Sequence, residues 1–106
     1  KLASMDMEER YRLIISTILN AIGIRVEVER MLATGRIDLV AWLSRYIYVI
    51  ELKLSNNGGI AAAEQQITTC GYTEPFKGDT RKVVGLAVEL DSEGKGLIDW
   101  KVVEEQ

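Results

Sequence analysis

The amino-acid sequence predicts an α/β fold in which helices flank a mixed β-sheet. The chain has 106 residues, of which 47% are hydrophobic, and this is enough apolar material for one globular core. Periodic segments follow each other in the order α-β-β-β-α-β-β. Three consecutive strands are typical of an antiparallel meander and a helix between strands is typical of a crossover, so the order indicates a mixed sheet.

The first helix is predicted between Asp6 and Gly23. Asp6, with Glu9 three residues later, has the spacing of a capping box, and Gly23 suits a left-handed helix end. Between them, apolar residues recur at spacings of three and four, which predicts one buried helix face. The residues of this predicted face are Tyr11, Ile14, Ile15, Ile18, Leu19 and Ile22.

Three strands are predicted next. Residues 24–30 alternate strictly between apolar and polar side chains, as in a half-buried strand, and residues 36–42 follow after a short turn. Residues 46–54 include the most apolar stretch of the chain. Because strands that are buried on both faces are apolar throughout, we expect residues 46–54 to form the central strand.

A second helix and two further strands complete the predicted fold. Residues 55–59 have loop composition, and the helix predicted at residues 60–70 is rich in alanine at its start. Residues 72–80 contain the only proline and are expected to be irregular. The last two strands are predicted at residues 81–89 and 97–103, with turn residues between them.

The aromatic residues of these strands are expected to serve packing. Trp42, Tyr46 and Tyr48 lie in apolar strands, where packing in the core or at its edge is a commoner role than stacking on nucleic-acid bases. Trp100, in the last strand, is likewise expected in the core.

Composition excludes several classes of enzyme. The chain contains no histidine, which excludes histidine-based catalytic triads and histidine-ligated zinc sites. Its single cysteine, Cys70, cannot form an internal disulfide bond, and no apolar run approaches the ~20 residues of a membrane-spanning helix. We therefore expect a soluble protein of the reducing cytoplasm without a membrane partner.

The charge balance bears on the partners of the chain. Thirteen basic and sixteen acidic residues give a net charge of −3, whereas a self-sufficient DNA-binding module is usually basic. Binding to nucleic acid would therefore need a local basic patch or basic surface from elsewhere. The sequence begins at Lys1 and shows no signal-peptide pattern, so we interpret residues 1–106 as one domain cut from a longer protein.

Two acids and a lysine are predicted to meet on one part of the sheet. Glu51 and Lys53 project from the same face of their strand because side chains alternate. Asp38 interrupts the preceding apolar strand, and a hairpin centred on residues 44–45 would bring Asp38 close to Glu51. Two carboxylates that are close on a partly buried face repel, so one pKa should rise unless a cation lies between them.

This combination of residue types favours phosphodiester hydrolysis. Oxygen ligands without histidine or thiolate are typical of Mg²⁺ or Mn²⁺ rather than zinc. A lysine beside two such acids can orient water and stabilise the charge that develops on the phosphate. The alternative interpretation is a structural ion-pair cluster.

The motifs resemble those of the PD-(D/E)XK nuclease superfamily, whose core has the order αβββαβ. More narrowly, the chain is similar to the nuclease-like domain found C-terminal to predicted AAA-type ATPases in bacteria. The resemblance extends over about residues 8–103 and implies a restriction-endonuclease-like fold, although Ile37 replaces the proline of the superfamily's name. The matching segments are Gly35-Arg36-Ile37-Asp38, Glu51-Leu52-Lys53, Gln66-Ile67, Gly71-Tyr72, Pro75-Phe76 and Ile98-Asp99-Trp100.

The resemblance also implies roles at matching positions. Asp38 and Glu51 would bind Mg²⁺ or Mn²⁺ with the backbone carbonyl of Leu52, and Lys53 would be the catalytic lysine. Gln66 matches a position where related nucleases place a polar residue beside the site. An ordinary polar position on the helix is the equally weighted alternative for Gln66.

Three positions near these motifs are open to two interpretations. Glu9, or its neighbour Glu8, is either the extra metal ligand that many members carry on the first helix or an acid favoured by the helix dipole. Arg36 is either an ion-pair partner or a phosphate contact. Close relatives often have a histidine near the position of Arg12, so if that histidine takes part in the chemistry, this chain lacks it.

The resemblance therefore implies a Mg²⁺- or Mn²⁺-dependent deoxyribonuclease domain. Its partners would be DNA and an N-terminal AAA-type ATPase in the same protein, and the sequence leaves a homodimer open. A second hypothesis is a catalytically inactive nuclease-fold domain that senses nucleic acid or regulates the attached ATPase. A third is a scaffold or oligomerisation module in which the acids and the lysine form a buried ion pair.

Overall fold

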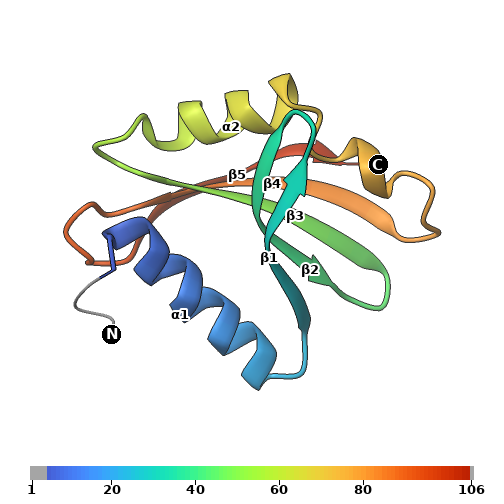
Figure 1. The fold of residues 1–106 in the computed structure, drawn as a ribbon, viewed down its shortest axis with the longest axis horizontal. Coiled ribbons are helices and arrows are strands. Elements are labelled where there is room, and N and C mark those ends of the chain that lie inside the picture. The colour runs from blue at the N-terminus through green and yellow to red at the C-terminus, as the bar shows by residue number, and fades with distance from the viewer. Residues whose placement is uncertain (1–4, 106) are drawn as a thin grey trace.

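The computed structural model describes residues 5–105 and contains every predicted element within two residues of its predicted ends (Figure 1). A short 3₁₀ helix lies within the stretch that was expected to be irregular. The elements are α1 (Met7–Ala21), β1 (Arg25–Leu32), β2 (Gly35–Trp42), β3 (Tyr46–Leu54), α2 (Gly59–Thr69), the 3₁₀ helix η2 (Glu74–Phe76), β4 (Lys82–Leu90) and β5 (Leu97–Glu105).

The strands form one mixed sheet in the order β1-β2-β3-β4-β5. The pair β3–β4 is parallel and is connected through α2, whereas the other neighbours are antiparallel. The two helices cover opposite faces of this sheet (Figure 1). The predicted α/β class with a mixed central sheet is therefore confirmed. Within the described part of the chain, neither helix combines the length and the apolar character needed to cross a membrane.

Strand β3 lies at the centre of the sheet and is buried on both faces, as predicted. Ile47 and Val49 belong to the core cluster under α2, together with Ile67 of that helix. Ile50 and Leu52 point to the other face and belong to the cluster under α1. Alternation along β3 therefore supplies both cores, and the residues that follow Ile50 lie between two well-packed layers.

Helix α1 begins and ends as its sequence predicts. The Asp6 side chain caps the helix by accepting a hydrogen bond from the Glu9 N–H at 2.8 Å. Gly23 has a φ of +92°, and the N–H of Ile24 donates to the Leu19 carbonyl, which closes the helix end. A left-handed backbone of this kind favours glycine, so Gly23 determines where α1 stops.

The predicted apolar face of α1 is only partly buried, and this expectation was wrong for three residues. Ile14, Ile18 and Ile22 are 42%, 56% and 68% exposed. Tyr11, which was predicted on this face, is buried as expected, whereas the burial of Arg12 was not expected. Tyr11 accepts a hydrogen bond from the N–H of Gly96 and donates one to the Asp91 carbonyl, and Arg12 reaches a buried carboxylate. These distant contacts set the rotation of the helix, which its own periodicity does not determine.

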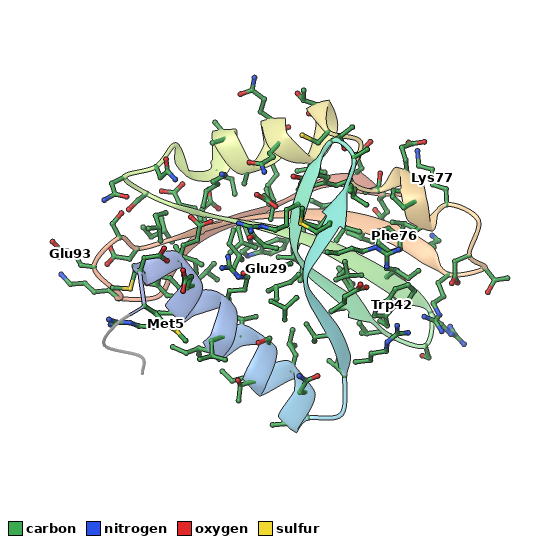
Figure 2. The ribbon with its side chains drawn as sticks, viewed as in Figure 1. Met5, Glu29, Trp42, Phe76, Lys77 and Glu93 are labelled. Atoms are coloured by element: carbon green, nitrogen blue, oxygen red, sulfur yellow. The ribbon has the colours of Figure 1, made fainter. Side chains whose placement is uncertain are left out.

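The expectation that the aromatic residues pack in or beside the core was also correct for some residues and wrong for one. Trp42 packs edge-to-face on Phe76 with ring centroids 5.5 Å apart (Figure 2). Tyr46 stacks on Tyr48, so packing in or beside the core is confirmed for the strand residues. Trp100 is 59% exposed, so its expected place in the core was wrong. Trp100 lies on the edge strand β5. Helix α1 packs mainly against β1, β2 and β3, so it does not cover the β5 edge of the sheet.

Candidate active site

The β2–β3 hairpin brings Asp38 and Glu51 together. Cross-strand pairing is centred on residues 44–45, as the sequence predicts, and Asp38 and Glu51 follow directly after its last regular pair. Beyond that pair, the Oδ2 atom of Asp38 accepts a hydrogen bond from the Leu52 N–H at 2.9 Å. The Asp38 side chain thus binds β3 where the backbone ladder between the strands stops.

Asp38 is a buried carboxylate whose charge is compensated by Arg12 from α1. The Oδ1 atom of Asp38 accepts a hydrogen bond from Arg12 Nη1 at 3.1 Å, and the two residues are only 4% and 7% exposed. Arg12 Nη2 also pairs with Glu29 Oε1 at 2.7 Å. Because an unpaired charge is very unfavourable in the interior, this ion pair is what allows Asp38 to lie there as a carboxylate.

Glu29 occupies an irregular point of β1, beside α1 (Figure 2). Its φ is +55°, and it interrupts the pairing of β1 with β2 between Val28 and Arg30. A left-handed conformation in a residue other than glycine costs about 1–3 kcal/mol and is often found where a side chain has a particular task. Here the irregularity falls at the residue that binds Arg12. Arg36 lies 3.5 Å from the second Glu29 oxygen, which makes it a weak ion-pair partner.

Glu51 has a different environment. It is only 2% exposed, and its Oε1 atom is buried without a hydrogen-bond partner. Burial, together with the charge of Asp38, raises the pKa of Glu51 to about 8, and the charge of Lys53 opposes this shift. One member of the carboxylate pair therefore has the raised pKa that two close acids are expected to produce.

Lys53 follows Glu51 on the same face of β3 and is half-buried. It makes no ion pair with any of the residues 5–105. Its side chain lines a hollow of about 360 Å³ between β3 and α2, and Asn57 and Gln66 line the same hollow. A lysine with free hydrogen-bond donors thus lies beside the acids and borders open space.

The acids of the first helical turn are not equivalent. Burial and the charge of Asp38 raise the pKa of Glu8, while Lys53 and Arg12 lower it, so Glu8 is close enough to sense the site. Glu9, the residue proposed from the sequence as a ligand, lines a separate hollow with Arg12. Within the described residues, no group of three or more acidic or cysteine side chains is gathered closely enough to hold a metal ion.

A hydroxyl group links the remaining motif residues. Tyr72 Oη donates to the Arg36 carbonyl and accepts from the Arg36 N–H, both at 3.0 Å, and it also accepts from Gln66 Nε2 at 3.0 Å. A Cβ atom at Gly35 would lie only 2.5 Å from this hydroxyl, so the close approach requires glycine. Gln66 therefore borders the Lys53 hollow and also helps to hold the start of β2 against α2.

Sequence reasoning missed two partners of the site. The resemblance marks Arg12 only as the position of a histidine in close relatives, and nothing in the sequence pairs it with Asp38. Glu29 had no signal of its own, because strict alternation placed it on the polar face of its strand. Tyr72 belongs to a recognisable motif, but its contact with β2 bridges 36 positions in the sequence.

The sequence model of the PD-(D/E)XK nuclease superfamily matches residues 6–100, which is most of the chain. The chain belongs to this superfamily. No curated protein matches the chain. The match spans Asp38, Glu51 and Lys53, and the two helices and five-stranded mixed sheet agree with a restriction-endonuclease-like fold.

Members of the PD-(D/E)XK superfamily generally use divalent metal ions, and the donor atoms of this chain fit such an ion. The buried Glu51 Oε1 lacks a partner, and the Asp38 carboxylate lies beside it. Carboxylate and carbonyl oxygens are the ligands that Mg²⁺ and Mn²⁺ prefer. A cation would also offset the burial and the repulsion by Asp38 that together raise the Glu51 pKa.

Proposed function

We propose that this PD-(D/E)XK domain is a metal-dependent nuclease that hydrolyses DNA phosphodiester bonds. The observation that carries the proposal is the buried Glu51 oxygen without a partner, next to Asp38 and on the same strand face as Lys53. An unsatisfied buried carboxylate destabilises a protein, and such groups concentrate at functional sites. A purely structural cluster would leave neither this oxygen nor the Lys53 ammonium group unpaired.

In this proposal Asp38, Glu51 and the Leu52 carbonyl hold Mg²⁺ or Mn²⁺. The bound ion would supply positive charge for the scissile phosphate and lower the pKa of a water molecule. The Leu52 N–H donates a hydrogen bond to Asp38, which fixes the backbone of Leu52 relative to this proposed metal ligand. Lys53 would orient the attacking water or stabilise the charge that develops on the phosphate.

Other residues of the site act through these groups. Arg12 is a positioning residue, because it binds one oxygen of Asp38 and makes no hydrogen bond to Glu51 Oε1. Gln66 positions the start of β2 through Tyr72. Of the two acids proposed for the first helix, Glu8 is the better supported additional ligand, since its pKa responds to Asp38 while Glu9 lines another hollow.

We also propose a larger context for the domain. The resemblance to nuclease-like domains that follow AAA-type ATPases supports a cytoplasmic protein in which residues 1–106 are one domain. The net charge of −3 supports the same arrangement, because basic surface for holding DNA would then come from the attached part.

One observation favours a second function, that of an inactive nuclease-fold domain that senses nucleic acid or regulates the attached ATPase. Arg12 already supplies a positive charge to Asp38 at 3.1 Å, so one of the two proposed ligands is neutralised by the protein itself. A site of this kind binds a metal ion more weakly than two free carboxylates would. The two functions are separated by cleavage of DNA.

The test is a nicking time course on supercoiled plasmid at low salt with Mn²⁺, at matched folded fractions. Lys53→Met should lower the nicking rate about 100-fold or more, because the lost group acts on the water or the developing charge. Its affinity for DNA should fall only modestly, since one phosphate contact among several is lost. The control is Lys95→Met, since Lys95 is an exposed lysine on the β4–β5 turn and should not matter for nicking.

Equal nicking by the wild type and Lys53→Met would show contamination or a different site. Absence of nicking by the wild type, also when it is joined to any upstream domain, would support the sensing function instead. Metal binding is measured separately through the thermal midpoint. An ion at 100 times its Kd should stabilise the fold by about 2.7 kcal/mol, and Glu51→Gln should lose this gain.

A further inference from the structure

Strand β5 is an edge strand with an exposed apolar surface. The sheet order places it at the end of the sheet, beside β4. Four of its apolar side chains are between 43% and 61% exposed, although they lie in a regular strand. These residues are Leu97, Ile98, Trp100 and Val102.

The two edge strands of the sheet differ in the regularity of their middle parts. Strand β1 is interrupted at Glu29, whose positive φ and ion pair with Arg12 disturb the edge in its middle. The irregularities of β5 lie near its two ends, and its middle from Asp99 to Val102 pairs regularly with β4. A regular edge with exposed apolar side chains is a template for another strand.

The charges in the middle of β5 are self-complementary. Asp99 and Lys101 flank Trp100, one on each side. If two copies of β5 pair in antiparallel fashion with Trp100 opposite Trp100, each Asp99 faces a Lys101 of the second copy. The same register places Ile98 opposite Val102, so both the charges and the apolar side chains match.

Within its own chain, Asp99 accepts a hydrogen bond from the backbone N–H of Trp100 at 2.8 Å. On β4, its cross-strand neighbour is Glu89, and like charges that face each other across a sheet are unfavourable. The Glu89 carboxylate is held in place because it accepts a hydrogen bond from the Ile60 N–H at 2.9 Å. A lysine on the open side of Asp99 would offset this repulsion.

An apolar hollow of about 470 Å³ borders the same edge on the α1 side of the sheet. Tyr11 and Ile15 of α1, Val88 of β4, and Leu97 and Trp100 of β5 are among the residues that line it. Pairing at Trp100 would place the second indole ring beside this surface. Burial of aromatic surface would then add to the backbone hydrogen bonds of the new strand pair.

We propose that two copies of this chain associate through β5, antiparallel and across a two-fold axis at Trp100. The two sheets then join into one, and every contact occurs twice, as in any isologous interface. This proposal goes beyond the nuclease function and does not depend on it, because no residue of β5 belongs to the Asp38–Glu51–Lys53 site. Failure of one proposal would therefore leave the other intact.

The test exchanges charges on β5 and measures association by sedimentation velocity. Asp99→Lys places lysines opposite lysines at both ends of the proposed pair, and Lys101→Glu places acids opposite acids. Each variant alone should dimerise about tenfold or more weakly than the wild type. An equimolar mixture of the two variants should recover a mixed dimer, because the lysine introduced in one copy then faces the glutamate introduced in the other.

Two controls exclude a general effect on folding. Lys101 pairs with Glu64 of α2 at 2.9 Å within its own chain, so Glu64→Lys breaks the same ion pair without changing the edge. This variant should dimerise like the wild type. Circular dichroism should show the same secondary structure in all variants, and the mixing experiment compares proteins that are each folded.

Three results would overturn the proposal. The first is a wild-type protein that stays monomeric at concentrations up to about 1 mM, the range in which interactions worth about 4 kcal/mol become visible. The second is undiminished dimerisation of Asp99→Lys and Lys101→Glu, which would indicate another interface. The third is a mixture of the two variants that stays as monomeric as each variant alone.

Discussion

The candidate site has two halves whose charges are satisfied to different degrees. The α1 half consists of Asp38, Arg12 and Glu29, and each of its carboxylates has a guanidinium partner within 3.1 Å. The α2 half consists of Glu51, Lys53, Gln66 and Tyr72, and it contains a buried carboxylate oxygen without a partner. Each half contributes one of the two acids, Asp38 or Glu51, that lie directly beyond the last regular pair of β2 and β3.

This difference separates stability from function within one site. In the α1 half each carboxylate has its partner, and removal of one member destabilises the fold because it leaves an uncompensated buried charge. The α2 half holds a carboxylate in an unfavourable state that a cation can relieve, and it leaves a lysine free beside open space. Arg12→Met and Glu51→Gln should therefore have opposite effects on the free energy of unfolding of the metal-free protein at pH 8.

The largest effect is expected for Arg12→Met in the α1 half. The substitution leaves the Asp38 carboxylate buried without its partner and should lower the free energy of unfolding by about 3–5 kcal/mol. Urea denaturation at pH 7 measures this change. Arg36→Met is the control, since Arg36 is half-exposed and makes only a 3.5 Å ion pair, and it should cost less than about 1 kcal/mol. A small loss for Arg12→Met would mean that the two halves do not differ.

The second prediction concerns the pH dependence that the α2 half confers. Between pH 4.5 and about 8, Glu51 is protonated in the folded protein and ionised in the unfolded chain. The folded state therefore binds more protons, so stability should fall as the pH rises through this window, by up to about 1.4 kcal/mol per pH unit from this group. Above pH 8 the contribution of Glu51 should be constant.

Glu51→Gln should remove this part of the pH dependence and make the metal-free protein more stable than the wild type at pH 8. The measurement is a set of denaturation curves from pH 5 to pH 8 for both proteins. Millimolar Mn²⁺ should flatten the wild-type profile, because a bound cation lowers the Glu51 pKa. Parallel profiles for the wild type and Glu51→Gln would show that Glu51 is not the buried, raised-pKa group.

The third prediction concerns the hydroxyl of Tyr72, which joins the two halves through β2. Tyr72→Phe removes three hydrogen bonds and should lower the free energy of unfolding by about 1–3 kcal/mol. Gly35→Ala should also destabilise the fold, because its Cβ would lie 2.5 Å from that hydroxyl. The double variant should cost less than the sum of the two changes, and strict additivity would contradict the contact.

The smallest effect is expected for Gln66→Leu, which removes one hydrogen bond at the border of the hollow. Its cost should be about 0.5–1.5 kcal/mol, and its effect on nicking should disappear when Tyr72 is already replaced by phenylalanine. Nicking rates of the single and double variants measure this coupling. An undiminished effect of Gln66→Leu beside Tyr72→Phe would place Gln66 in direct contact with the substrate.

The sequence by itself determined the order of the elements, the ends of α1 and the register of the central hairpin. These features depend on residues that are close in the chain: the Asp6 cap, the Gly23 end, and the alternation on both sides of residues 44–45. The proximity of Asp38 to Glu51 follows from that register, because side chains directly across a hairpin share a face. The rise of one carboxyl pKa was predictable, but which of the two acids it affects was not.

Only the tertiary structure decided the rotation of α1 and the exposure of the edges. Periodicity shows that a helix has an apolar stripe, but the ion pair of Arg12 with Asp38, 26 positions away, turns another face inward and leaves Ile18 exposed. Trp100 is exposed for a related reason, since burial at an edge depends on whether a distant element covers it. Such contacts join segments far apart in sequence, so no local pattern records them.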